Sequence, residues 1–205
     1  MSARDNVAAN PSDTCDVALL LIDVINDFEY PGGEALLKNA LPAAHRIAAL
    51  KRNAQQRHIP VVYVNDNFGK WRAERSQLVR HCLDDGVRGE PIVRLLAPEE
   101  SDYFVLKPRH SGFYQTPLDL LLTYLKARAL ILAGFAGDIC VLLTAADAFL
   151  RDYRLFIPGD CSASQDNAEN EHFLRYAARV LDANTTPSPD LNLGDLLTHA
   201  SQIHR

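Results

Sequence analysis

Apolar and polar positions alternate along the chain in blocks that predict strands and helices in turn. Five short apolar runs rich in β-branched residues have the length of buried strands: Val17–Ile22, Val61–Val64, Tyr103–Leu106, Leu130–Ala133 and Leu155–Ile157. Stretches with apolar residues at helical spacing separate most of them: Glu34–Arg57, Pro117–Lys126, Cys140–Tyr153 and Ala168–Leu181. Pro42 predicts a helix start within the first of these stretches.

Strand and helix in repetition predict an α/β fold with a doubly wound, mostly parallel sheet and helices on both faces. We expect one domain over residues 1–205, with residues 1–14 and 184–205 peripheral. The segment Asn65–Ala97 is less regular, because several glycines and many charges interrupt it. It predicts a long excursion over a functional site. The tail after Asn184 resembles a linker that leads to a short final helix.

The composition narrows the classes of partner. The net charge is −5 and no basic run is present, which argues against nucleic acid and anionic membranes and favours a small-molecule substrate. Residues 1–14 are polar, without the apolar stretch of a signal peptide, so we expect a cytoplasmic protein. The four cysteines form no CxxC pair and are expected to be reduced thiols: Cys15, Cys82, Cys140 and Cys161.

Three chemically reactive residues follow three of the predicted strands. Asp23, Lys107 and Cys140 each come at or just after a strand end, and the carboxyl ends of parallel strands open on one edge of a sheet. Cys140 also begins a helix, so the helix dipole and the Lys107 ammonium are both expected to favour its thiolate. Asp23 could take the thiol proton and later deliver it to a leaving group. The set predicts an acyl-transfer site.

Three sequence blocks carry a resemblance to a known superfamily. LLIDVINDF at 20–28, LKPRHSGFYQT at 106–116 and GFAGDICVLLTA at 134–145 resemble, in order and spacing, the signature blocks of the isochorismatase-like cysteine hydrolases. That superfamily includes nicotinamidases, carbamoylsarcosine amidases, ureidoacrylate-type amidohydrolases and isochorismatases. The resemblance extends from about Asp16 to Leu181.

The resemblance implies a role for each residue of the site. Asp23 is the general acid and base, Lys107 the electrostatic partner and Cys140 the nucleophile. An oxyanion hole would use the backbone N–H groups of Ala136 and Cys140, next to a cis peptide bond between Phe135 and Ala136. The resemblance also implies a reaction without a cofactor and a homodimer or homotetramer.

The chain departs from its relatives where some of them bind a metal ion. Metal-dependent nicotinamidases carry an Asp-x-His pair after the second strand, whereas here Asp66 is followed two residues on by Phe68. No histidine follows before His81, so we expect no metal site of that kind. Nicotinamidase activity is correspondingly disfavoured.

Other residues near these blocks have structural interpretations. Asp138 is expected to cap backbone amides of the turn, and Asn26, Asp27, Thr144 and Asp147 to serve similar ends. Arg109 and His110 could meet a substrate carboxylate, although solvated loop positions are commoner. Four aromatic residues are candidates for the wall of a substrate pocket: Phe28, Phe68, Trp71 and Tyr114.

The residues and the resemblance together predict a cysteine-dependent hydrolase of an amide or ureide C–N bond in a small molecule, acting through a thioester. Two alternatives stay open. One is hydrolysis of the vinyl ether of an isochorismate-like substrate, which needs an acid but no nucleophilic thiol. The other is a non-catalytic ligand-binding module on the same fold.

Overall fold

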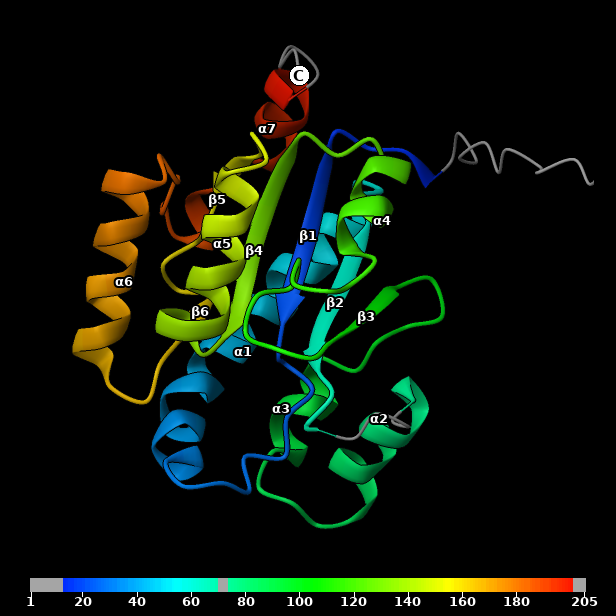
Figure 1. Ribbon diagram of the computed structural model, residues 1–205, viewed down its shortest axis with the longest axis vertical. Helices are drawn as coiled ribbons and strands as arrows, with labels where there is room; N and C mark the ends of the chain where they lie inside the picture. The colour runs from blue at the N-terminus through cyan, green and yellow to red at the C-terminus, as the bar shows by residue number, and fades with distance from the viewer. Residues whose placement is uncertain (1–12, 70–73, 201–205) are drawn as a thin grey trace, which may run out of the picture.

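The computed structural model describes residues 13–69 and 74–200. Within these residues, six parallel strands form one twisted sheet in the order β3-β2-β1-β4-β5, with β6 paired to the carboxyl end of β4 (Figure 1). Their bounds are β1 Val17–Ile22, β2 Val61–Asp66, β3 Tyr103–Lys107, β4 Ala129–Phe135, β5 Arg154–Phe156 and β6 Ser162–Ala163. The five predicted strands are therefore present, and β6 is an addition to them.

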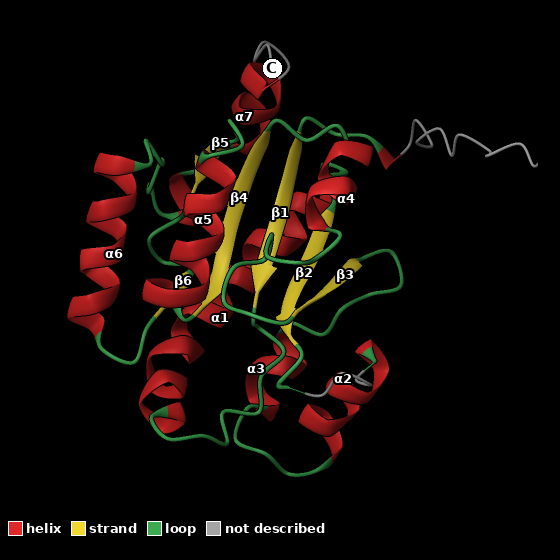
Figure 2. Ribbon diagram, in the orientation of Figure 1, coloured by secondary structure: helices red, strands yellow, loops and turns green. Residues whose placement is uncertain are grey.

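In the part of the chain that the structure describes, seven α-helices accompany the sheet (Figure 2). They are α1 Gly33–Gln56, α2 Arg75–Asp84, α3 Glu90–Leu95, α4 Leu118–Tyr124, α5 Leu142–Phe149, α6 Asn167–Val180 and α7 Leu193–Ala200. A π-helical turn, η2, spans Gly137–Val141 directly before α5, and a 3₁₀ turn, η3, spans Ser188–Asp190. No described helix is long and apolar enough to cross a bilayer.

Period-two alternation along the strands divides the core into two halves. On β1, Leu19 and Leu21 face one half and Leu20 and Ile22 face the other, although every residue of the strand is buried. The first half is closed by α1, α2, α3 and α7, and the second by α4, α5 and α6. The predicted doubly wound α/β fold with helices on both faces is confirmed.

Two predicted details are wrong. Helix α1 runs through Pro42 without a new start, because apolar residues at helical spacing on both sides of the proline remain buried against the sheet. The segment Asn65–Ala97 is not an irregular excursion, since it contains α2 and α3. Pro91 lies in the first turn of α3, where the missing N–H costs no helical hydrogen bond.

Candidate active site

The site begins where β1 ends, at the carboxyl edge of the sheet. Asp23 has a φ of 52°, a left-handed conformation that costs energy in a residue with a Cβ. Phe28 and Phe68, on the loops after β1 and β2, share this conformation with φ values of 58° and 50°. Left-handed backbone conformations thus occur at Asp23 itself and on the two loops that border it.

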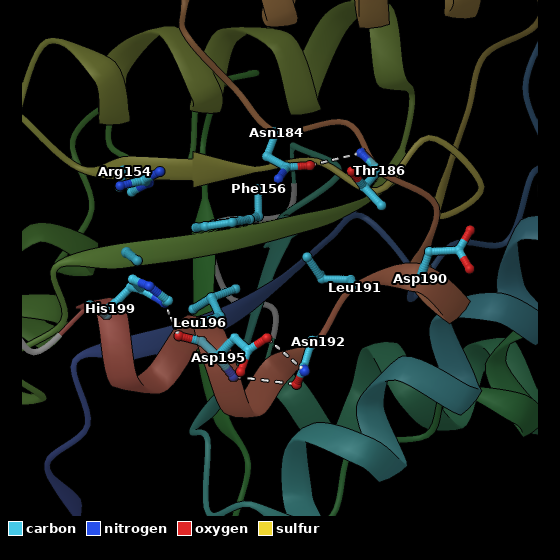
Figure 3. A pocket seen from close by; sticks show the side chains of 12 residues that line it. Arg154, Phe156, Asn184, Thr186, Asp190, Leu191, Asn192, Asp195, Leu196 and His199 are labelled. Carbon is cyan, nitrogen blue, oxygen red and sulfur yellow. Dashed lines mark hydrogen bonds between the residues drawn. The ribbon is translucent and has the colours of Figure 1, made fainter.

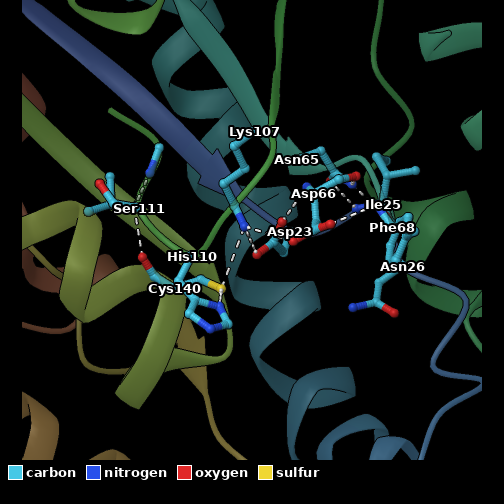
Figure 4. Close-up of polar contacts among 12 residues, drawn as sticks. Asp23, Ile25, Asn26, Asn65, Asp66, Phe68, Lys107, His110, Ser111 and Cys140 are labelled. Carbon is cyan, nitrogen blue, oxygen red and sulfur yellow. Dashed lines mark hydrogen bonds and ion pairs between the residues drawn. The ribbon is translucent and has the colours of Figure 1, made fainter. Parts of the chain in front are cut away.

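Lys107 ends β3 and is fully buried. Its Nζ lies 2.8 Å from Asp23 Oδ2, 3.5 Å from Asp66 Oδ2 and 3.6 Å from Cys140 Sγ (Figure 4). The three predicted catalytic side chains thus meet around one ammonium group. Asp23 and Cys140 also influence each other's pKa, so the acid and the thiol are electrostatically coupled beside the same ammonium group.

Cys140 lies near the end of η2, immediately before α5, and only 9% of its surface is exposed. The Val141 N–H donates to Ala136 O, five residues back, which closes the π-helical turn around the cysteine. The peptide bond between Phe135 and Ala136 is cis, at the predicted position. The assignment of an oxyanion hole to the N–H groups of Ala136 and Cys140 stays a prediction.

Gly134 lets β4 enter this turn. Its φ is 134°, and a Cβ at this position would overlap the carbonyl oxygen of Ile22 on β1. The close approach brings the end of β4, and with it Cys140, against the end of β1, which carries Asp23. Glycine is thus required both for its backbone conformation and for its lack of a side chain.

The electrostatics of the site agree with the prediction that Lys107 favours the Cys140 thiolate, and they add opposing effects that the sequence did not show. Burial and the charge of Asp23 raise the pKa of the Cys140 thiol well above its ordinary value, and the opposing influence of Lys107 is smaller. Burial also raises the pKa of the Asp23 carboxyl, against the effect of Lys107. Burial alone would lower the pKa of Lys107, but the neighbouring anionic groups raise it overall. Burial and the charge of Asp23 therefore favour the protonated thiol, which has a carboxyl group nearby that could accept its proton.

Two polar residues at the end of β2 were not predicted to belong to the site. The Asp66 N–H donates to Asp23 Oδ1 at 2.7 Å and its carboxylate faces Lys107. Asn65, fully buried, accepts from the Ile25 N–H at 3.0 Å and donates to the Ile25 carbonyl at 2.8 Å. Asn65 thereby holds the loop after Asp23 in place. The sequence could have indicated both residues, because β2 also ends in polar residues at the same edge of the sheet.

A third residue, His110, reaches the sulfur from the loop after β3. Its Nδ1 lies 3.7 Å from Cys140 Sγ, although the residue as a whole is exposed. Sequence reasoning favoured a solvated loop position for it. The direct contact could not be anticipated, because the path of the loop between β3 and α4 decides it.

The polar residues predicted to be structural largely are so. Thr144 donates to the Cys140 carbonyl at 2.7 Å and accepts from the Gly112 N–H at 3.0 Å, which ties the cysteine turn to the loop after Lys107. Asp138 is an exception, because its side chain caps no backbone amide and its buried Oδ1 has no partner among the described residues. Its own N–H is instead satisfied by the Ser164 hydroxyl.

The predicted pocket aromatics occupy different environments. Phe28 is fully buried and packs against Phe135, so it supports the cis turn from within the core. Phe68 is partly buried on the loop after Asp66. Tyr114 is 54% exposed and lines a cavity of about 420 Å³ that His110 also borders. Trp71 lies outside the described residues.

Other concave regions of the described chain do not belong to this site. A cavity of about 290 Å³ lies beside α7 and the first residues of β4 and β5, which places it at the opposite edge of the sheet (Figure 3). Within residues 13–69 and 74–200, no three histidine, cysteine or acidic side chains are arranged to hold a metal ion.

Comparison with known proteins places the chain in a family. The profile of the isochorismatase domain matches residues 17–187, which include every element from β1 to α6. The chain belongs to the isochorismatase family. It is an isochorismatase-like hydrolase, in agreement with the resemblance of the three sequence blocks.

Several relatives illustrate the range of this family. The chain is 43% identical to the uncharacterized isochorismatase family protein YaaI of Bacillus subtilis, covering 83% of this chain and 93% of that protein. It is 28% identical to the ureidoacrylate amidohydrolase RutB of Methylorubrum extorquens, covering 75% and 71%. The structure of N-carbamoylsarcosine amidase from Thermoplasma acidophilum superposes with a TM-score of 0.66 at 26% identity, covering 86% of this chain and 99% of that one.

Proposed function

We propose that this isochorismatase-like hydrolase cleaves an amide or ureide C–N bond in a small molecule through a thioester on Cys140. One observation carries the proposal: the buried Lys107 Nζ lies 2.8 Å from Asp23 Oδ2 and 3.6 Å from Cys140 Sγ, so one ammonium group joins the acid and the thiol. A nucleophile, a proton acceptor and a cation in contact are the groups that acyl transfer needs. Relatives named as a ureidoacrylate amidohydrolase and an N-carbamoylsarcosine amidase support the C–N bond as the target.

The first half of the reaction forms the thioester. The thiol proton passes to Asp23 as Cys140 Sγ attacks the substrate carbonyl carbon. The backbone N–H groups of Ala136 and Cys140 stabilise the negative oxygen of the tetrahedral intermediate. The C–N bond then breaks, and Asp23 gives its proton to the departing nitrogen.

The second half releases the acid. Asp23, again a carboxylate, takes a proton from a water molecule as the water oxygen attacks the thioester carbon. It returns that proton to the sulfur of Cys140 as the C–S bond breaks. The raised pKa of Asp23 suits both directions of transfer, because the carboxyl holds a proton more firmly than an exposed aspartate does. Lys107 stays protonated throughout and balances the negative charge on either partner. The scheme requires no cofactor.

The test is ammonia release from a panel of small primary amides and ureides. Cys140→Ser and Cys140→Ala should each lower turnover by at least about 10³-fold, because both remove the thiol nucleophile. Cys15→Ser is the matched control, since Cys15 is also a free thiol but lies before β1, far from the carboxyl edge of the sheet.

A second readout follows the intermediate itself. Intact-mass analysis after rapid acid quench should show the acyl group on the wild-type chain and on Cys15→Ser, and none on Cys140→Ala. Retained turnover in Cys140→Ala would overturn the proposal. It would point instead to the vinyl-ether reaction, in which Asp23 acts as an acid without a thiol.

A further inference from the structure

The sulfur of Cys140 has polar neighbours on two sides. Asp23 and Lys107 lie on one side, and the imidazole of His110 lies on the side away from them (Figure 4). Asp23 acts on the thiol through its charge, Lys107 Nζ lies 3.6 Å from the sulfur, and His110 Nδ1 lies 3.7 Å from it. The proposed mechanism uses the first two and leaves His110 without a role.

Lys107 is shared among several neighbours, so it is not a dedicated partner of the Cys140 sulfur. Its ammonium group faces two carboxylates, Asp23 at 2.8 Å and Asp66 at 3.5 Å, in addition to the sulfur at 3.6 Å. With both carboxylates ionised, this cluster already carries one net negative charge before any thiolate forms. A buried sulfur that ionises there would gain from an N–H donor that is not shared with a carboxylate.

His110 is placed where it could donate to the sulfur. Its Nδ1 lies 3.7 Å from the sulfur, which is hydrogen-bond distance for this large atom. The residue is exposed and borders the cavity of about 420 Å³ that Tyr114 also lines, so solvent reaches the ring while one nitrogen faces the thiol. No hydrogen bond or ion pair to another described side chain competes for that nitrogen.

We propose that His110 is a fourth catalytic residue, which donates a hydrogen bond from Nδ1–H to the Cys140 sulfur as the thiolate forms. The thiol proton still passes to Asp23, and His110 keeps its own proton, so the balance of the reaction is unchanged. The role rests on the proposed function, because it assists attack by sulfur. It also assists departure of the thiolate when the thioester is hydrolysed.

Three substitutions separate donation at Nδ1 from the mere presence of a ring. His110→Phe keeps an aromatic ring and removes the donor. His110→Asn keeps an N–H close to the position of Nδ1, whereas the longer His110→Gln carries its N–H close to the position of Nε2. His45→Phe, an exposed histidine on α1, is the matched control.

The measurement is the rate of Cys140 alkylation by iodoacetamide as a function of pH, followed by mass spectrometry of the Cys140 peptide. Resolving the peptide separates this thiol from the other three: Cys15, Cys82 and Cys161. We expect His110→Phe and His110→Gln to slow alkylation at neutral pH by about tenfold and to move the profile to higher pH by about one unit. His110→Asn should stay within about threefold of wild type, and His45→Phe should match it.

Two results would overturn the assignment. One is wild-type alkylation in His110→Phe, and the other is an Asn variant as slow as the Phe variant. Circular dichroism of each variant separates a loss of fold from a loss of the donor. Because alkylation needs no substrate, a chain that hydrolyses none of the amides tested would refute the proposed function and leave this measurement intact.

Discussion

The ion pair between Lys107 and Asp23 allows a quantitative prediction about stability. The two charges lie 2.8 Å apart, with the lysine fully buried and 5% of Asp23 exposed. At an effective dielectric constant of about 20, their attraction is about 6 kcal/mol. Removal of one partner from a buried pair typically costs about 3–5 kcal/mol, since the other charge is left without compensation.

Lys107→Met should therefore lower the free energy of unfolding by about 3–5 kcal/mol near pH 8. Asp23→Asn should cost less, about 2 kcal/mol, because the amide oxygen still accepts from the Asp66 N–H and Lys107 retains Asp66. The double variant buries neither charge of the pair. We expect its loss to be smaller than the sum of the two single losses by at least about 2 kcal/mol.

The pH dependence of Lys107→Met has a definite sign. Without the ammonium group, burial raises the pKa of Asp23 in the folded state further above its value in the unfolded chain. Such a group stabilises the fold fully below its unfolded pKa, and this contribution is lost as the pH rises through the folded pKa. The cost of Lys107→Met should therefore be smaller near pH 5 than near pH 8.

Urea denaturation of the four proteins, followed by circular dichroism at both pH values, measures these quantities. Additive single losses, within about 0.5 kcal/mol, would refute the reasoning, because they would mean that the two groups do not interact in the folded chain. A cost of Lys107→Met that is equal at both pH values would refute the assignment of the buried charge to Asp23.

Two further predictions concern the loops that carry the site. Asn65→Leu should destabilise the chain by about 2–3 kcal/mol, because it leaves the N–H and the carbonyl of Ile25 unpaired in a buried position. Hydrogen exchange of the Ile25 amide measures this, and unchanged protection would contradict the prediction. His81 connects α2 to the loop after β1, and its hydrogen bond to Asp85, reinforced by Asp27, raises its pKa. The stability that His81 contributes is present at acidic pH and lost as the pH rises through that raised pKa. The melting temperatures of wild type and His81→Gln should therefore converge toward pH 9, and a gap that widens instead would contradict the assignment.

The meeting of Asp23, Lys107 and Cys140 could be predicted from the sequence, because a parallel sheet brings its carboxyl strand ends to one edge whatever the lengths of the connections. The contribution of Asn65 was missed for a different reason. A polar residue at a strand end is typical of a loop boundary, and its hydrogen bonds to the loop after β1 depend on strand register, which the sequence alone does not specify.

The ionisation of the thiol was harder still to predict. Helix position and Lys107 both favour a thiolate, and sequence shows both. Burial and the proximity of Asp23 oppose it, and these depend on distances and exposed fractions. The net direction of the pKa shift depends on how these opposing influences compare, and only the three-dimensional structure shows that. The same holds for α2 and α3, whose buried faces are narrow and whose many charges resemble those of a loop.

The raised pKa of the Cys140 thiol has a consequence for oxidative damage. Peroxides attack thiolates far faster than thiols, so the burial that disfavours the Cys140 thiolate also slows its oxidation. The low exposure of the cysteine adds to this protection. Under the proposed function, Cys140 would therefore react during turnover and resist oxidation between turnovers.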